Sequence, residues 1–142
     1  MHNRLDLDRD GNLTVSGNIR AERCAGPVFV DLADEHSGSM SGYKGANNTC
    51  AAGHPGSHLC TVEEALRSVS CGTFAAVPSG LPNGTRFWIA TGPPGFTAPA
   101  NDCRGWTSAA AGELGAFWEY DANGGRGLLS SCDIPYRLGC CM

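Results

Sequence analysis

Two groups of side chains in this sequence could do covalent chemistry. Cys60 lies close to His54 and His58, and a cysteine beside a histidine is the nucleophile and base of many hydrolases. Glu119 and Asp121 are paired carboxylates of the kind that hydrolyse glycosides, but alternate residues of one strand define no catalytic spacing. We expect every cysteine to be oxidised, which leaves no thiolate. The sequence also contains no phosphate-binding loop, H-E-x-x-H or G-x-S-x-G motif, so we expect that the protein is not an enzyme.

An acidic run near the N-terminus could bind a cation. Asp6, Asp8 and Asp10 precede Gly11 and match the first half of the calcium-binding loop D-x-D-x-D-G. Gly17 occupies the position of the bidentate glutamate, and no helices flank the run, so a solvated acidic turn is the alternative. Calcium is the one cofactor that the sequence suggests, with these three aspartates as its ligands.

The stretch GAFWEYDANGGRG, residues 115–127, has the composition of a contact surface. Trp118 and Tyr120 alternate along one strand, so their side chains share a face. Aromatic and arginine side chains supply much of the binding energy at many interfaces. The candidate ligand-binding residues here are Trp118, Glu119, Tyr120, Asp121, Asn123 and Arg126. The alternative for Trp118 is a place over the core.

A long loop follows the most apolar strand of the chain. Its sequence, GPPGFTAPAND (92–102), contains three prolines, which exclude a helix or a paired strand. Long loops on small scaffolds often carry function, so Phe96, Asn101 and Asp102 are further candidate ligand-binding residues, although Asn and Asp also favour turns. We expect this loop and residues 121–127 to form one ligand-binding edge.

The composition indicates a loop-rich domain that gains from covalent cross-links. The chain of 142 residues contains 8 cysteines, 20 glycines and 8 prolines. It has no C-x2-C pair, and its 4 histidines are scattered, which favours a disulfide framework over a zinc site. Disulfides indicate an extracellular or virion-surface protein, although the N-terminus lacks the apolar region of a signal peptide. The net charge of −4 without a basic run argues against nucleic acid as a partner, and no apolar run is long enough for membrane insertion.

Short runs of alternating or apolar residues predict strands throughout the chain. The expected strands are 28–32, 85–91, 103–107, 117–120, 128–132 and 137–142. The strand at 85–91 is the most apolar, and we expect it to be central. Phe87 and Ile89 lie on one of its faces and Trp88 on the other, because strand side chains alternate.

Two stretches predict helices. In residues 43–52 the spacing of Tyr43, Ala46 and Cys50 places the cysteine on an inward face. Residues 61–70 carry the stronger signal, because Thr61 and a glutamate three residues later form a capping box. The residues expected to face inward in this second helix are Val62, Ala65, Leu66 and Val69.

Residues 1–23 differ from the rest of the chain. Leu13, Val15 and Ile19 alternate with polar residues, and glycines occupy the turn positions, a pattern typical of short strands. Two short strands are marginal alone, so we expect a β-structured stalk that packs against copies of itself. The stretch GNLTVSGNI resembles the β-structured shafts that trimeric phage tail fibres and adhesins place before a tip domain. This resemblance implies a homo-oligomer, namely a trimer.

The order of elements from residue 26 to residue 142 resembles the C-type lectin-like fold. It comprises a strand, a Cys-bearing helix, a second helix begun by HLCTVEEA, the strand FWIA, a long loop, C-x-x-W, a Trp strand, a Cys strand and a terminal GCC. The resemblance implies a disulfide-rich, loop-rich α+β domain over residues 24–142. Sugar-binding members of the family carry E-P-N or Q-P-D in the long loop and W-N-D before the penultimate cysteine. This chain has APAND and LLSSC in their places, which puts a calcium-dependent sugar site in doubt.

The resemblance also implies disulfide pairs. In this family a cysteine of the first helix bonds to the last strand, and two later cysteines bond to each other. Carried onto this sequence, Cys50 pairs with Cys140 or Cys141, and Cys103 pairs with Cys132.

The vicinal pair constrains the remaining bonds. Neighbouring strand residues face opposite sides, so Cys140 and Cys141 need partners in different places. In the lectin-like fold the first and last strands lie antiparallel to each other, and Cys24 precedes the first strand. One of Cys140 and Cys141 should bond to the helix, and Cys24 is then the candidate partner of the other. Cys60 and Cys71 then remain as a pair, although the helix between them is about 15 Å long, more than a disulfide spans.

These observations favour a non-catalytic binding or adhesion module at the tip of an oligomeric fibre. Its long-loop edge would recognise a surface receptor or a glycan, and repetition would convert weak contacts into avidity. The alternative is a structural subunit of an extracellular filament or capsid decoration, whose loop edge contacts neighbouring copies.

Overall fold

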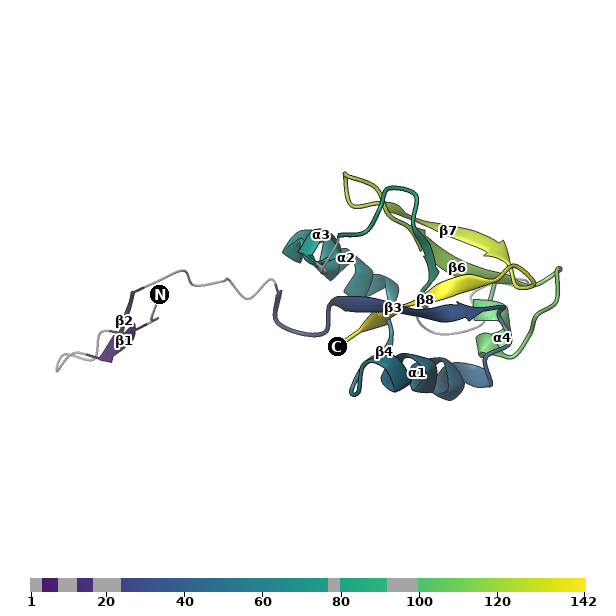
Figure 1. The fold of residues 1–142 in the computed structure, drawn as a ribbon, viewed down its shortest axis with the longest axis horizontal. Coiled ribbons are helices and arrows are strands. Elements are labelled where there is room, and N and C mark those ends of the chain that lie inside the picture. Colours follow the sequence, from purple (N-terminus) through teal and green to yellow (C-terminus); the bar gives the residue numbers. More distant parts are fainter. Residues whose placement is uncertain (1–3, 8–12, 17–23, 77–79, 92–99) are drawn as a thin grey trace.

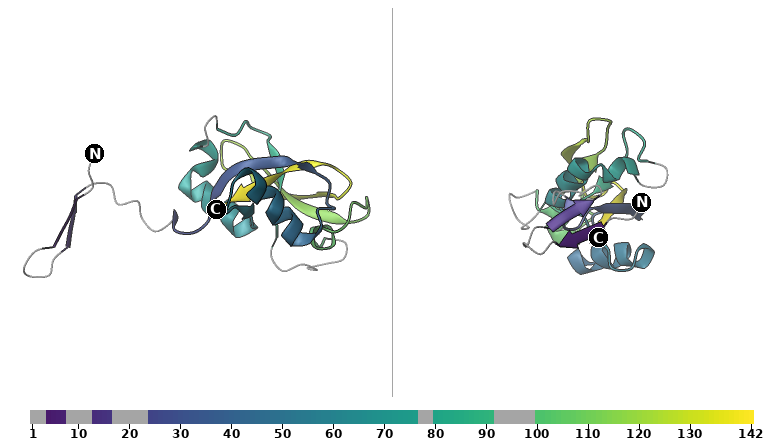
Figure 2. Two further views of the ribbon diagram at one scale, coloured as in Figure 1. Left: turned by 60° about the horizontal axis from the view of Figure 1, so that its bottom comes forward. Right: turned by 90° about the vertical axis from the view of Figure 1, so that its left-hand side faces the viewer.

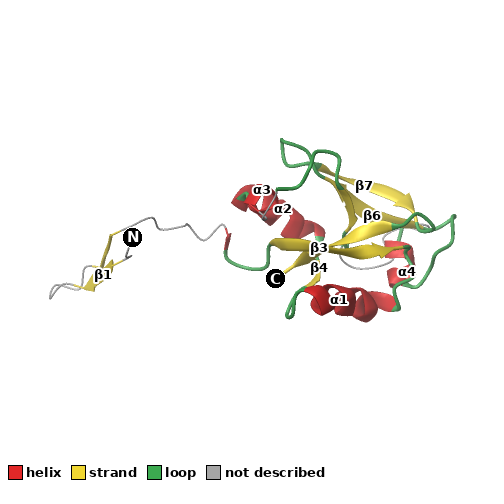
Figure 3. Cartoon of the chain, in the orientation of Figure 1, coloured by secondary structure: helices red, strands yellow, loops and turns green. Residues whose placement is uncertain are grey.

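A computed structural model describes residues 4–7, 13–16, 24–76, 80–91 and 100–142. In the N-terminal segment, β1 (Arg4–Leu7) and β2 (Leu13–Ser16) pair antiparallel, with Leu5 opposite Val15. The short strands expected in this segment are therefore present (Figure 3).

Some of the residues predicted to bind calcium or a ligand are not among the described residues. Asp8, Asp10 and Phe96 are outside the described residues. Asp6 belongs to β1, but the side chains of that strand are not described. The calcium prediction and the predicted role of Phe96 therefore stay predictions.

A six-stranded sheet is the framework of residues 24–142 (Figure 1). Its strands are β3 (Phe29–His36), β4 (His58–Leu59), β5 (Arg86–Trp88), β6 (Leu114–Glu119), β7 (Arg126–Ser131) and β8 (Tyr136–Cys141). Their order is β3-β8-β5-β6-β7, with β4 paired to β8 off this path. The runs predicted as strands at 28–32, 85–91, 117–120, 128–132 and 137–142 all contribute to this sheet. The described chain is thus a mixed α and β fold.

The helices lie on both sides of the sheet, with α1 (Gly42–Gly53) opposite α2 (Val62–Cys71) and α3 (Thr73–Ala76) (Figures 1 and 2). The predicted capping box starts α2: Thr61 Oγ1 accepts from Glu64 N–H, and the Glu64 carboxylate accepts from Thr61 N–H. The prediction that Leu66 faces inward is wrong, because Leu66 is 55% exposed. The helix packs on the sheet through Ala65 and Ser68, which rotates Leu66 outward.

The central strand β5 separates two hydrophobic clusters, as its alternation predicts. Phe87 and Ile89 pack with Phe74 of α3 on one side. Trp88 packs on the other side against Trp106, with ring centroids 5.4 Å apart. Each cluster is closed by its own helix layer, so the sheet is buried on both faces at its centre.

The strand expected at 103–107 is absent, and the structure has instead a single turn, α4 (Asp102–Trp106). Its residues have positive φ, from 52° at Asp102 to 63° at Trp106, so the turn is left-handed. Such a turn costs about 1–2 kcal/mol for each residue other than glycine, and no alternation pattern could indicate it. The bond between Cys103 and Cys132 and the burial of Trp106 hold it in place.

Four disulfide bonds use all eight cysteines. The Cys103–Cys132 bond and the bond from Cys50 to Cys140, one of its two expected partners, are present. Cys140 contributes to the cluster with α1, whereas Cys141 contributes to the cluster with α2. The vicinal cysteines therefore do serve opposite faces of the sheet, as the strand geometry requires.

The expected pairs Cys24 with Cys141 and Cys60 with Cys71 are wrong, because the structure joins Cys60 to Cys141 and Cys24 to Cys71. The two-residue strand β4 pairs with β8 and brings Cys60 within 5.0 Å of Cys141, measured between Cα atoms. The chain before β3 runs along α2: Arg67, within the helix, donates to Pro27 O at 2.8 Å, and Cys24 bonds to Cys71, the last residue of the helix. No sequence signal predicted β4, and this omission caused both errors.

Candidate functional site

A small cleft lies between the α2–α3 pair and the turn that joins β6 to β7. Its volume is about 200 Å3. Its lining residues are Ser68, Val69, Gly72, Phe74, Ala75, Tyr120, Ala122, Asn123 and Gly124. Four of these belong to the predicted stretch 115–127, and two of the four, Tyr120 and Asn123, are predicted ligand-binding residues, so the structure brings part of that stretch to a concave surface.

The cleft has an aromatic and aliphatic wall. The rings of Phe74 and Tyr120 pack with centroids 5.5 Å apart, and Val69 reaches the wall from α2. Ser68 is fully buried, and its hydroxyl donates to Glu64 O at 2.7 Å while accepting from Phe29 N–H. Ser68 is therefore committed to holding α2 on β3, and the polar groups available to a ligand must come from the β6–β7 turn.

Asp121 organises that turn. Its Oδ1 accepts from the N–H of Asn123 at 2.7 Å and from the N–H of Gly125 at 3.1 Å. Gly124 and Gly125 have φ of 110° and 96°, which residues with a Cβ rarely adopt. A Cβ on Gly124 would also lie 2.6 Å from a Val69 methyl. The glycines thus let the turn approach α2 closely enough to form the cleft.

Trp118 supports the turn from the core side. Its side chain is buried, with 4% of its surface exposed, and its indole N–H donates to Gly124 O at 3.0 Å. The alternative considered for Trp118, a place over the core, is therefore the one that the structure has. Burial in the second hydrophobic cluster leaves little of its surface for a ligand, and the ligand-binding role of Trp118 stays a prediction.

Glu119 lies between two guanidinium groups. Its carboxylate accepts from Arg86 Nε at 2.6 Å and from Arg126 at 3.0 Å. The hydrogen bond from Arg86, followed by that from Arg126, holds the pKa of Glu119 below its ordinary value. A general acid requires a raised pKa, so Glu119 does not have the environment of the general acid in glycoside hydrolysis.

Two polar groups at the cleft are uncommitted. Among the described residues, neither the Tyr120 hydroxyl nor the Asn123 carboxamide has a hydrogen-bond partner in the chain. Asn123 is exposed and Tyr120 is half-buried, so both groups can meet a ligand without breaking an internal bond. Together they offer one hydroxyl and one amide beside an apolar wall.

Asn101 and Asp102, the other predicted contacts, do not line the cleft. Asn101 caps the left-handed turn by accepting from Arg104 N–H at 2.7 Å. Asp102 is 2% exposed, and it accepts from the Tyr43 hydroxyl and the Thr91 hydroxyl, each at 2.8 Å. Burial raises the pKa of Asp102, and the hydrogen bonds from Thr91 and Tyr43 oppose this shift without cancelling it. Both residues stabilise the turn itself, and a turn-forming role was the alternative considered for them.

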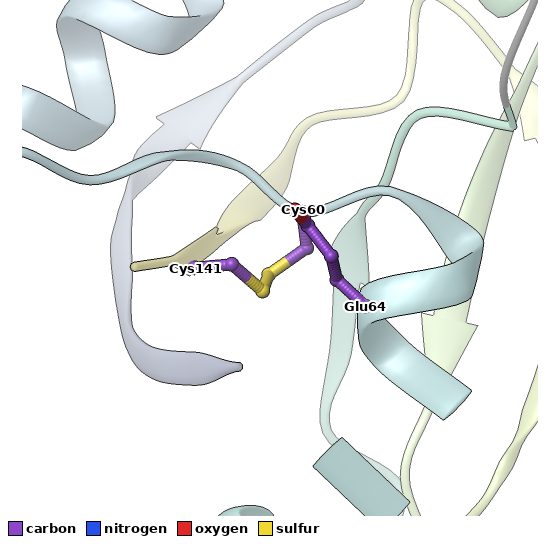
Figure 4. A group of neighbouring side chains, drawn as sticks. All are labelled: Cys60, Glu64 and Cys141. Carbon is purple, nitrogen blue, oxygen red and sulfur yellow. A yellow bond between two sulfur atoms is a disulfide. The ribbon is translucent and has the colours of Figure 1, made fainter. Parts of the chain in front are cut away.

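A third group resembles a metal site by composition alone. Cys60, Glu64 and Cys141 lie together at the start of α2 (Figure 4). The two sulfur atoms are bonded to each other, so neither is a thiolate that could bind a metal or attack a substrate. Glu64 closes the capping box and pairs with His58, 2.9 Å from its ring nitrogen. The nucleophile considered at Cys60 is therefore absent.

A second hollow, of about 390 Å3, lies between β3 and the end of α1 and was not predicted from the sequence. At its rim the Asp31 carboxylate lies 2.8 Å from the His54 ring nitrogen. Burial raises the pKa of Asp31, but the hydrogen bonds from His54 and Leu32 N–H, with the charges of His54 and Arg137, outweigh it and lower the pKa. The two residues are 23 positions apart and on different elements, so no local motif could indicate the pair.

Comparisons with known proteins identify no relative of this chain. No family model, no curated protein and no solved structure matches it. None of the helices in the described ranges is long and apolar enough to cross a membrane. Four disulfide bonds fit an extracellular protein, because such bonds persist in oxidising surroundings.

Proposed function

We propose that this protein is a non-catalytic recognition module that binds one terminal sugar ring of a surface glycan in the cleft between α2–α3 and the β6–β7 turn. The observation that carries the proposal is the pairing of an apolar wall with two uncommitted polar groups, the Tyr120 hydroxyl and the Asn123 carboxamide. A sugar ring has an apolar face and a rim of hydroxyls, so it matches both features of the cleft. The module would serve at the tip of an oligomeric fibre, on a virion or another extracellular surface.

The size of the cleft limits the ligand. Pockets for drug-sized molecules have volumes of roughly 300–1,000 Å3, whereas this cleft has about 200 Å3. A single ring with few contacts binds weakly, so useful affinity requires several copies acting together. A homo-oligomer, with a trimer as the form expected from the N-terminal segment, would supply them.

We also propose that residues 24–142 adopt the C-type lectin-like fold. The element order, the adjacency of β3 and β8, and the bonds Cys50–Cys140 and Cys103–Cys132 support it. The tripeptides that bind calcium and sugar in that family are absent from this sequence. We therefore expect binding at the β6–β7 turn to be independent of calcium.

A glycan array probed with the labelled full chain tests the proposal. We expect a set of glycans with a shared terminal sugar to be retained, with equal signal in calcium and in EDTA. Asn123→Ala and Tyr120→Phe should each weaken binding to the best glycan by about tenfold, the cost of one or two hydrogen bonds to a ligand. Asn48→Ala, at an exposed asparagine of α1, is the matched control and should bind as the parent does.

Two outcomes would contradict the proposal. If the oligomeric chain retains no glycan on the array, glycans are excluded as its ligands. Retention that both cleft variants preserve would place the binding site elsewhere on the molecule.

A further inference from the structure

The six-stranded sheet ends in two edge strands, β3 and β7, and the two edges differ. An edge strand presents unpaired backbone groups, and folded proteins commonly protect such edges with bulges, charges or covering segments. Comparing how each edge is protected shows where another strand could add.

The β3 edge is protected in several ways. Its pairing with β8 has register shifts between Phe29 and Asp31 and between Leu32 and Glu35, which bend the strand away from regular pairing. The guanidinium of Arg137 donates to Ala33 O at 3.0 Å and to Leu32 O at 3.2 Å. The exposed side chains of this strand are acidic, namely Asp31, Asp34 and Glu35.

Among the described residues, the β7 edge has none of these protections. It pairs with β6 over six consecutive residues without a register shift. Its sequence, RGLLSS, has no proline and only one charged side chain, that of Arg126, which is paired with Glu119. Leu129, at the middle of the strand, is 54% exposed.

The hydrogen-bond pattern shows which backbone groups meet the free edge. Cys132 N–H donates to Glu113 O, and this pair continues the register of β6 with β7. Hydrogen-bonded and non-hydrogen-bonded pairs alternate in an antiparallel ladder. It follows that Gly127, Leu129 and Ser131 direct their N–H and C=O groups away from β6, toward the free edge. The Ser131 carbonyl also accepts from Ile134 N–H at 3.2 Å, so its unpaired group is the N–H.

This arrangement is self-complementary about Leu129. If a second β7 lies antiparallel to the first with Leu129 opposite Leu129, the outward groups of the two leucines can bond to each other. Gly127 then lies opposite Ser131 of the other copy, and the small side chains at both positions leave room for the strands to approach. The exposed leucines meet on one face, which removes their apolar surface from water.

The charges at the ends of the strand agree with this pairing. Arg126 begins β7, and Asp133 follows its other end. An antiparallel neighbour places the start of one strand beside the end of the other, so each Arg126 comes near the exposed Asp133 of the second copy. A parallel neighbour would instead bring two Arg126 side chains together.

We propose that two copies of this chain associate by antiparallel pairing of their β7 strands about Leu129, which joins the two six-stranded sheets into one. The twofold axis of such a pair is perpendicular to the sheet, so the same faces of both copies lie on one side. The α2–α3 pair covers the same face in each copy, so both clefts open toward the same surface. The pairing stands on the strand edge alone and does not depend on what the clefts bind.

Sedimentation equilibrium of the full chain over a range of concentrations tests the pairing. We expect association that Leu129→Lys weakens by about tenfold or more, because a central charge replaces the buried contact. The matched control is Leu66→Lys, at an equally exposed leucine of α2, which should associate as the parent does. The intact mass of each variant should still show four disulfide bonds, and its melting temperature should equal that of the parent. A missing disulfide bond or a lowered melting temperature would reveal a folding defect instead.

A cross-link tests the register itself. Facing residues of a hydrogen-bonded antiparallel pair lie about 5.5 Å apart between Cα atoms, a separation that a disulfide spans. Leu129→Cys should therefore form a covalent dimer under mild oxidation, whereas Leu66→Cys should not. A chain that remains monomeric at every concentration would overturn the proposal. So would an oligomer whose mass Leu129→Lys leaves unchanged, because the N-terminal segment would then account for the assembly.

Discussion

Two turns of this molecule begin at an aspartate, carry residues with positive φ and were both predicted to bind a ligand, yet they have different roles. The turn at Asp102 receives its hydrogen bonds from Tyr43 and Thr91, 59 and 11 positions earlier in the sequence, and the Asp102 side chain is buried. The turn at Asp121 receives its bonds from the N–H groups of Asn123 and Gly125, its own neighbours. A carboxylate that joins distant segments is part of the core, whereas a locally closed turn leaves the adjacent side chains free.

The two turns also differ in how they adopt positive φ. The turn at Asp102 uses Asp102, Cys103, Arg104 and Trp106, which are not glycine, so the surrounding structure must hold it. The turn at Asp121 uses Gly124 and Gly125, which adopt such values without steric cost. We therefore expect the first turn to depend on its tertiary contacts and the second on its glycines.

The largest expected effect is that of Asp102→Ala. It removes the buried acceptor shared by the half-buried Tyr43 hydroxyl and by the Thr91 hydroxyl and N–H, so we expect a loss of about 3 kcal/mol in the free energy of unfolding. Asp121→Ala removes bonds that water can replace, and it should cost about 1 kcal/mol. Urea denaturation of both variants measures the difference. Equal losses would break the distinction between the two turns.

The next effect is that of Gly125→Ala. A Cβ at this position would lie 2.3 Å from Glu119 O and 2.7 Å from the Trp118 indole nitrogen. We expect a loss of about 2 kcal/mol in the free energy of unfolding, together with weakened binding at the cleft. Gly105→Ala is the control in the other turn, where a Cβ would meet only the movable ring of Tyr43, at 3.2 Å. It should cost about 1 kcal/mol, and a larger loss there than at Gly125 would contradict the comparison.

The smallest effects concern pH. The pKa of Asp102 is raised in the fold, so its contribution to stability is present below its ordinary value of 3.8 and is lost as the pH rises through the raised value. The pKa of Glu119 is lowered, so its contribution is present above its ordinary value of 4.5 and is lost as the pH falls through the lowered value. Titration of the side-chain carboxyl carbons by NMR should show the two shifts in opposite directions. The same direction for both would refute this account.

Local sequence signals predicted the elements well where the cause is local. The capping box at Thr61 and Glu64 set the start of α2, because its bonds join residues three apart. The alternation of Phe87, Trp88 and Ile89 predicted which face each side chain takes, because it follows from strand geometry. The prediction that Leu66 faces inward was wrong, because the side of a helix that is buried depends on the neighbour against which the helix packs.

The candidate site was predicted in part. Tyr120 and Asn123 were recognised from composition, but Phe74 and Val69, which make the opposite wall, come from α2 and α3, more than 40 positions earlier in the sequence. The two-residue strand β4 had no signal either, although it decides the partner of Cys141. Contacts between distant segments are set by packing, which a single sequence does not display.

The sequence by itself determined the oxidised framework, the α and β composition, the central apolar strand and the opposed directions of Cys140 and Cys141. These follow from residue types and from the periods of helices and strands, which are properties of a few neighbouring residues. Only the tertiary structure decided that Asp102 is buried, that Trp118 supports a turn from inside, and that the β3 edge is protected in ways that the β7 edge is not within the described residues. Each of these depends on which distant groups supply hydrogen bonds and exclude water, and that is settled only when the whole chain has packed.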